Sequence, residues 1–337
     1  MTPALQIWSE LAATPALAAG WNARRLSASS SAGILIAIRK PEDVPALLIE
    51  VSTTAVPPIT EYPSAEGFQV APESIAAGPT GRVRLCLILA NERYRDVFGV
   101  LVEDVVADLR NRQDENDVVR GFLARLRGWQ VFMRRHGPSP LPVEEQVGLT
   151  AELLFLRDRL VGEIPAQAAV SAWVGPLGAP QDFMLPQVAV EVKASASGIK
   201  EVQISSLAQL DTQLCPKPIL LCWMDLVAAP AGVSLPQIIS ELRRTLSRED
   251  PAALRVFEER LLEVGYLDAH EKHYVGRLYR LRATTLYSVL GAFPRVERGE
   301  VREGVLSCSY VIGLSGCDAF DIPPAEADRL IRGGARD

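Results

Sequence analysis

The sequence has 337 residues, of which 48% are hydrophobic and 23% are charged, and its formal net charge is −6. This composition is typical of a folded globular protein, and the length exceeds what one small core accommodates. We therefore expect two domains or one elaborated α/β domain. The acidic balance argues against a general polyanion-binding protein, but it does not exclude a local basic surface for nucleic acid.

Neither a membrane nor an export signal is predicted. No uninterrupted apolar run reaches the roughly 18 residues of a transmembrane helix, and no basic residues precede the apolar N-terminal stretch as they do in a signal peptide. The cysteines are Cys86, Cys215, Cys222, Cys308 and Cys317. They form no CxxC pair, which is typical of reduced core cysteines, so we expect a cytoplasmic protein.

Residues 1–136 predict an N-terminal α+β domain, with a role in target recognition or partner docking. Runs of β type are GILIAIRK at 33–40, ALLIEV at 46–51 and VRLCLILA at 83–90. Runs with helical spacing follow at 93–112 and 117–135. The stretch HGPSPLP at 136–142 then breaks the pattern and ends the domain.

Residues 142–337 predict a second domain with its core at 142–226. An amphipathic helix at 143–160 carries a stripe of leucines. Strands are expected at 168–175, 181–185 and 188–195, a short strand or turn leading into a helix at 201–212, and a strand buried on both faces at 217–226. The order is therefore helix, three strands, helix, strand. A helical region at 234–265 and strands within 274–290 and 304–316 form a C-terminal extension.

The stretch QDFMLPQVAVEVKAS at 181–195 places charges within a predicted hairpin. If the turn lies between residues 186 and 187, Phe183 faces Val190 and Asp182 faces Glu191. Side chains of a strand alternate between two faces. The apolar residues of both strands therefore share a core face, whereas Asp182, Glu191 and Lys193 share the other.

Two carboxylates directly opposite each other destabilise a sheet, and burial adds to the cost. Lys193 can relieve one of the two charges, whereas a divalent cation relieves both. Paired carboxylates are typical ligands of Mg²⁺, which keeps several waters and accepts substrate phosphate as a further ligand. The hairpin thus predicts a magnesium site at Asp182 and Glu191.

These residues carry a resemblance to a known family. An Asp followed by Glu-Val-Lys, together with the predicted order of elements, resembles the signature of the PD-(D/E)XK phosphodiesterases, which have the restriction-endonuclease-like fold. The longer string GLTAELLFL, W.GP, DF, VEVK.S and ISSLAQLD, within 148–211, is similar to a bacterial PD-(D/E)XK-motif family of roughly this chain length. One departure is Gln181, which stands where the motif has proline and which we expect to shape the backbone.

The resemblance implies a role for each matched residue. Asp182 and Glu191 would bind the metal, Mg²⁺ with Mn²⁺ as a substitute, and Glu152 of the preceding helix would add a ligand. Lys193 would orient or deprotonate the attacking water and stabilise charge at the phosphorus. Substrate-binding candidates near the site are Gln203, Ser205, Ser206 and Gln209, although either serine could instead cap the following helix.

Two basic stretches interrupt the acidic average, at 118–143 and at 272–296, and neither contains Asp or Glu. Such surfaces hold phosphate backbones, although each can equally be a solvated face. The candidates in the first stretch are Arg125, Arg127, Arg134 and Arg135.

The leading hypothesis is therefore a magnesium-dependent DNA endonuclease in a bacterial restriction or phage-defence system, working beside a methyltransferase or an ATPase. A double-strand cut needs two active sites, which favours a homodimer. The alternatives are a catalytically idle module of the same fold that binds nucleic acid or scaffolds a complex, and a nuclease for repair or for RNA.

Overall fold

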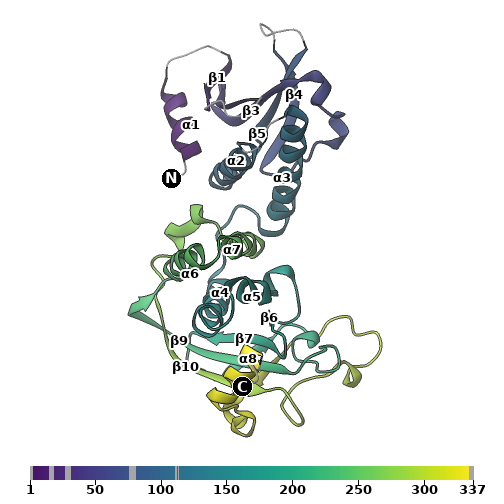
Figure 1. Ribbon diagram of the computed structural model, residues 1–337, viewed down its shortest axis with the longest axis vertical. Coiled ribbons are helices and arrows are strands. Elements are labelled where there is room, and N and C mark those ends of the chain that lie inside the picture. The colour runs from purple at the N-terminus through teal and green to yellow at the C-terminus, as the bar shows by residue number, and fades with distance from the viewer. Residues whose placement is uncertain are drawn as a thin grey trace. The chain divides into compact units, whose positions relative to one another are not determined.

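The computed structural model describes residues 3–14, 19–26, 32–75, 81–110, 112 and 114–333. They form a mixed α/β protein, drawn in Figure 1, that divides into two compact units, residues 1–140 and residues 141–337. Within the described ranges, no helix is both long and apolar enough to cross a membrane.

The described part of the first unit contains one antiparallel sheet, in the order β1-β2-β3-β5-β4. Its strands are β1 Gly20–Arg25, β2 Gly33–Lys40, β3 Val44–Ser52, β4 Phe68–Ser74 and β5 Arg82–Leu89. The three apolar runs of the sequence are the central strands β2, β3 and β5, as predicted. Both edge strands were missed, because an edge strand buries too few side chains to show a clear apolar pattern.

Helices α1 Pro3–Ala13, α2 Arg95–Leu109 and α3 Glu115–His136 complete this unit. Trp8 of α1 stacks on Phe98 of α2 at 5.4 Å between ring centroids, and its indole N–H donates to Ala46 O of β3 (3.2 Å). The Asp114 carboxylate accepts from Asp117 N (2.8 Å) and caps α3. The helix ends at Gly137, whose φ of 68° favours glycine.

The second unit has a sheet in the order β10-β9-β7-β6. Its strands are β6 Phe183–Met184, β7 Ala189–Ser195, β9 Ile219–Val233 and β10 Tyr279–Ser288. Strand β7 runs antiparallel to β6 and parallel to β9, and β10 runs antiparallel to β9. A separate pair joins β8 Glu201–Ile204 to β11 Tyr310–Gly313.

Both faces of this sheet are covered. Side chains from the helices pack on the face that carries Val190 and Val192; these helices are α4 Val143–Phe155 with its π-helical extension Leu156–Leu160, α5 Ala166–Ala172, α6 Leu235–Glu249, α7 Pro251–Glu263 and α8 Pro324–Arg332. On the opposite face, side chains of β8 and β11 pack with Leu221, Trp223 and Tyr287. Any polar group of β7 that faces this second core is therefore shielded from water.

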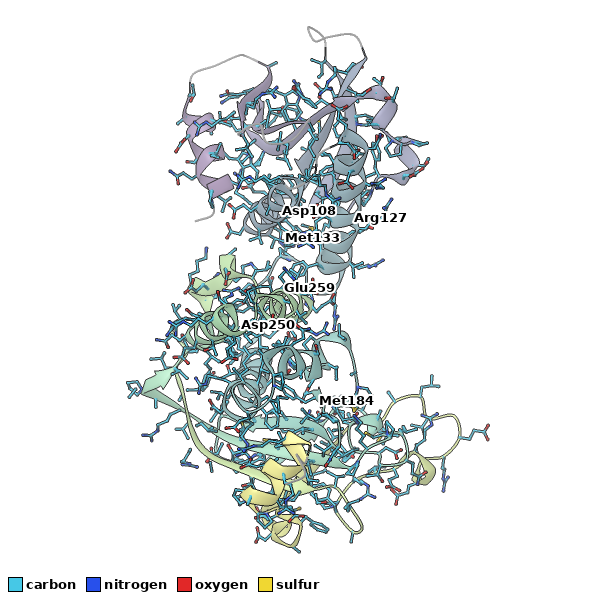
Figure 2. The ribbon with its side chains drawn as sticks, viewed as in Figure 1. Asp108, Arg127, Met133, Met184, Asp250 and Glu259 are labelled. Carbon is cyan, nitrogen blue, oxygen red and sulfur yellow. The ribbon has the colours of Figure 1, made fainter. Side chains whose placement is uncertain are left out.

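The helical region predicted at 234–265 is found as two helices. Asp250 ends α6 and its carboxylate accepts from Ala252 N (2.8 Å), so it caps α7, where Pro251 occupies the first turn. Figure 2 labels Asp250 at this junction.

Two expected elements of the core are wrong. Residues 168–175, expected as a strand, contain the end of α5, and only Trp173 forms a bridge, to Phe183. The alanine-rich sequence AQAAVSA favours a helix there. Residues 201–212 contain β8, but in place of a following helix they have only a 3₁₀ turn, Leu207–Gln209.

Candidate active site

The hairpin has the register predicted from the sequence. Phe183 pairs with Val190, Met184 pairs with Ala189, and Leu185 N donates to Val188 O (2.9 Å). The apolar side chains of the predicted core face, Phe183, Leu185, Val188, Val190 and Val192, all belong to one buried cluster. The charged residues of β7 therefore lie on the other face.

Asp182 is fixed at the start of the hairpin by contacts of its backbone and its side chain. Its carbonyl oxygen accepts from Val174 N (2.8 Å) and Gly175 N (3.0 Å), and its Oδ2 accepts from Val192 N (2.7 Å). No described residue donates to Oδ1. Oδ1 is therefore the oxygen left for a ligand.

Gly175 allows the loop after α5 to approach the carboxylates. A Cβ at this position would stand 2.9 Å from Asp182 Oδ1 and 3.5 Å from Glu152 Oε2. Both oxygens thus lie within 3.5 Å of one point. Any other residue at 175 would push against Asp182, so glycine is required by the close approach.

Glu191 is completely buried. Its Oε1 accepts from Lys193 Nζ (2.7 Å) and from Gln209 Nε2 (2.7 Å), whereas its Oε2 is buried without a hydrogen-bond partner. A carboxylate oxygen without a donor is costly to bury. It requires either a proton or a cation.

Glu152 projects from α4, whose leucine stripe is buried against the sheet. Its Oε2 accepts from Trp173 Nε1 (2.7 Å). Trp173 is buried and follows α5, so the indole holds Glu152 at the start of the hairpin, beside Asp182.

The three carboxyl groups have raised pKa values. Burial raises the pKa of Asp182 to about 6, although Val192 N and Lys193 oppose the shift. Burial, followed by the charge of Asp182, raises the pKa of Glu191 to about 8 and that of Glu152 well above its usual range. Burial opposes the charge on Lys193, but the carboxylates outweigh it and raise the pKa of this ammonium. Without a cation, each carboxyl group therefore keeps its proton to a higher pH than usual, and a bound cation would favour its ionised form.

The donor set fits a hard divalent cation. Glu191 Oε2 is buried without a hydrogen-bond partner, and the one hydrogen bond to the Asp182 side chain among the described residues goes to Oδ2. Such carboxylate oxygens are the type of ligand that Mg²⁺ and Mn²⁺ take. Among those residues, no cluster of three His, Cys, Asp or Glu side chains is arranged to hold a metal ion. Trp173 engages one oxygen of Glu152, just as Val192 N engages one oxygen of Asp182, so Glu152 is a third candidate ligand beside Asp182 and Glu191.

The other candidates of this unit differ in their relation to the carboxylates. Gln209 touches Glu191 directly, and its Oε1 accepts from Ser205 N (2.7 Å) and Ser206 N (3.4 Å). Ser206 is the N-cap residue of the 3₁₀ turn. Gln203 is exposed on β8, and its amide makes only a 3.5 Å contact with Ile204 O.

Sequence reasoning missed two residues whose side chains support the carboxylate site, Gln181 and Trp173. Gln181 is 3% exposed, and its amide donates to Ala208 O (2.6 Å) and Gln209 O (3.1 Å). Trp173 holds Glu152. The available signal for Gln181 was its place directly before Asp182, and for Trp173 its place in the W.GP string.

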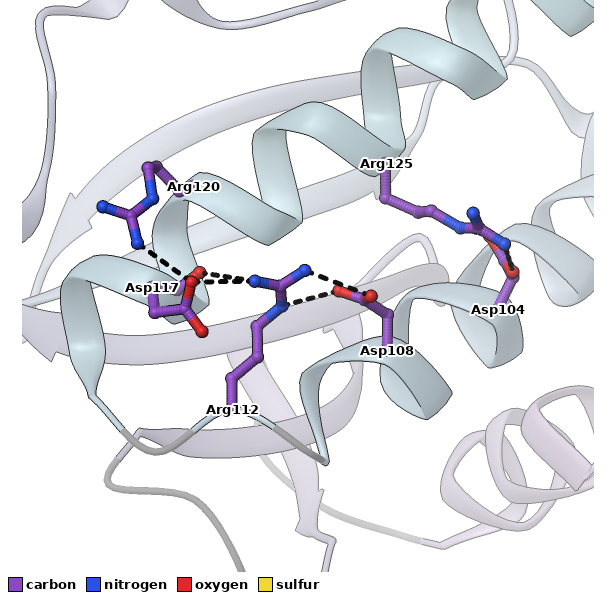
Figure 3. A network of polar contacts seen from close by, with 6 residues as sticks. All are labelled: Asp104, Asp108, Arg112, Asp117, Arg120 and Arg125. Carbon is purple, nitrogen blue, oxygen red and sulfur yellow. Dashed lines mark hydrogen bonds and ion pairs between the residues drawn. The ribbon is translucent and has the colours of Figure 1, made fainter.

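The four arginines lie on the exposed side of α3, in the first unit, and not with the carboxylates. Arg125 binds Asp104 of α2, and Figure 3 shows Arg120 and Arg112 binding Asp117 nearby. Arg127, labelled in Figure 2, donates to Glu61 O (3.3 Å). Arg134 and Arg135 are exposed in the last turn. Asp104, 21 positions before Arg125, and Asp117, on the same helix as Arg120, thus offset part of the basic stretch.

The mixed α/β fold, with an Asp and a Glu-x-Lys on adjacent strands of a hairpin, is nuclease-like. The chain belongs to the family described as "Putative PD-(D/E)XK family member" (DUF4420), whose family model covers residues 5–315. No curated protein and no solved structure gives a significant match to the chain. The family match includes both compact units.

Proposed function

We propose that the protein is a metal-dependent phosphodiesterase that cuts DNA as an endonuclease. The observation that supports this most is Glu191 Oε2, buried without a donor beside Asp182 and Lys193. Such an arrangement is unfavourable in a structural ion pair, which would use both oxygens. It suits a site that is completed by a cation and a phosphate.

Asp182 and Glu191 would hold the ion, with Glu152 as a further ligand. When bound, a divalent cation lowers the pKa of its water and neutralises a phosphate oxygen. Lys193 carries a raised pKa and therefore keeps its proton at neutral pH. We accordingly assign Lys193 to orienting the water and to placing positive charge beside the phosphate, rather than to removing a proton.

The buried carboxylates also weigh against a catalytically idle module. Removing one of them would relieve the repulsion, so a chain that only binds or scaffolds has no physical reason to keep both. DNA, rather than RNA, is proposed as the substrate from the family resemblance. A restriction or defence setting with a methyltransferase or ATPase partner, and a homodimer for double-strand cutting, are part of the same proposal.

The direct test is incubation of purified protein with supercoiled plasmid in EDTA, in Mg²⁺ and in Mn²⁺. Cutting that requires either metal supports the proposal. A protein that binds the plasmid and leaves it intact in all three conditions contradicts the enzyme and favours the binding module. A single-stranded RNA of matched length in the same series tests the choice of DNA.

A prediction about binding concerns α3. Replacing Arg125, Arg127, Arg134 and Arg135 together by glutamine is expected to weaken DNA binding and to flatten its salt dependence. The log–log slope should fall by about 0.9 for each arginine that contacts a phosphate. Arg125→Gln alone should have the smallest effect, because Asp104 already engages this side chain. Fluorescence anisotropy over a salt series measures the slope.

The exposed Arg93, elsewhere in the first unit, provides the control as Arg93→Gln. An unchanged slope in the fourfold variant would place the nucleic acid elsewhere. The next candidate is then Arg282 on β10, half-exposed and oriented by the buried Asp225 (2.6 Å) in the unit that holds the carboxylates.

A further inference from the structure

Gln181 stands at the position before Asp182, where the motif has proline, and its side chain faces inward. Its Nε2 donates to two consecutive carbonyl oxygens of the 3₁₀ turn Leu207–Gln209, Ala208 O (2.6 Å) and Gln209 O (3.1 Å). Proline has no side-chain donor and could not make these contacts. A 3₁₀ turn of three residues has few internal hydrogen bonds, so two external ones contribute much of its restraint.

Backbone groups at the start of this turn hold the side chain of Gln209. Its Oε1 accepts from Ser205 N (2.7 Å) and from Ser206 N (3.4 Å). Because these donors are backbone groups, the amide has one orientation, with Nε2 directed away from them. That Nε2 donates to Glu191 Oε1 (2.7 Å).

The consequence falls on Glu191. Lys193 and Gln209 both donate to Oε1, so the carboxylate is held by one oxygen and Oε2 remains without a donor. If Gln209 turned away, only Lys193 would hold the group, and the carboxylate could rotate. The contact therefore selects which oxygen faces the cation.

We propose that Gln181 and Gln209 form a positioning chain that fixes Glu191 with Oε2 presented to the metal. Neither glutamine touches the substrate in this assignment; both act through Glu191. The inference rests on the proposed metal site, and it predicts that the chain sets affinity for the cation. Groups that orient a metal ligand typically change metal affinity by about 10- to 100-fold when they are removed.

The test uses the full chain and two variants that keep side-chain volume, Gln181→Met and Gln209→Met. Calorimetric titration with Mg²⁺ and with Mn²⁺ is expected to show affinity reduced by about 10-fold or more in both. The double variant should lose no more than the stronger single one, because the two residues act in series. DNA affinity in EDTA should stay at the wild-type value.

Two further variants separate positioning from folding. Gln209→Asn keeps a neutral amide but is one methylene shorter, so it cannot both accept from Ser205 N and donate to Glu191, and the metal affinity should fall. Gln167→Met, on an exposed glutamine of α5 that pairs only with Ser171, should match the wild type. Melts in EDTA report whether each variant is folded.

Folded Gln181→Met and Gln209→Asn proteins that bind both cations as tightly as the wild type would overturn the inference. The proposed function would survive that result if plasmid cutting still depended on Asp182 and Lys193. A wild-type protein that binds neither cation would overturn both. A loss of DNA affinity in EDTA equal to the loss of metal affinity would instead make the glutamines substrate contacts and refute the positioning role.

Discussion

Each of Asp182→Ala, Glu191→Ala and Lys193→Ala is expected to abolish Mg²⁺-dependent nicking or cutting of supercoiled plasmid. Asp182→Ala and Glu191→Ala remove the carboxylates that would hold the metal ion. Lys193→Ala removes the ammonium group that lies beside Glu191. A metal ion stabilises transition-state charge by several kcal/mol, so the rate should fall by about 100-fold or more. Gel analysis of plasmid topology over a time course measures this.

The control for these variants is Glu144→Ala, an exposed carboxylate on α4, the helix that carries Glu152. It should cut at the wild-type rate. Glu152→Ala should lose less activity than Glu191→Ala, because the oxygen that is buried without a hydrogen-bond partner belongs to Glu191. Equal cutting by the wild type and by all three site variants would end the assignment. If cutting requires the proposed partner proteins, the same comparison is made with those proteins added.

The hairpin could be predicted from the sequence because a period of two constrains it tightly. Phe183, Val190 and Val192 face the core under the helices, and a slip of one residue would place Glu191 and Lys193 in that apolar core instead. Once this register is known, the position of Asp182 and Glu191 on the opposite face follows without further information. Strand β9 could also be predicted, from a different signal: a continuous apolar run such as ILLCWM suits a strand that is covered on both faces.

The supporting contacts could not be predicted in the same way. The helix Ala166–Ala172 has a local signal in its alanine-rich sequence, but the bridge from Trp173 to Phe183 that follows it is a tertiary contact without such a signal. The turn at 207–209 is held by the Gln181 side chain, which donates to carbonyl groups 27 and 28 positions further along the chain. No periodicity of the sequence encodes such a contact. Asp104, which neutralises Arg125 of α3, likewise comes from another helix, α2.

A second large effect is expected on stability in the absence of metal. Burial raises the folded pKa of Asp182 to about 6, and burial together with the charge of Asp182 raises that of Glu191 to about 8. A raised carboxyl pKa favours the folded state at low pH and costs stability as the pH rises from about 4 through the folded value. In EDTA the wild type should therefore lose stability between pH 4 and pH 8.

Asp182→Asn should remove part of this loss and be at least as stable as the wild type in EDTA at pH 8. Asparagine keeps an oxygen that can accept from Val192 N, so the hairpin contact survives. Glu144→Gln, which alters an exposed carboxylate, should retain the wild-type pH dependence. Thermal melts across this pH range compare the three proteins.

In Mg²⁺ the wild type should instead be more stable than Asp182→Asn. At about 10 mM ion and a dissociation constant of about 1 mM, binding stabilises the folded wild type by about 1.4 kcal/mol, a rise of a few degrees at most in a chain of this size. Asp182→Asn should lose most of that rise, because one of the two open oxygens is no longer a carboxylate. If Asp182→Asn melts well below the wild type in EDTA at every pH, and Mg²⁺ shifts both proteins equally, Asp182 is a structural hydrogen-bonding residue. The paired-carboxylate metal site is then wrong, because the repulsion that it is meant to relieve does not exist.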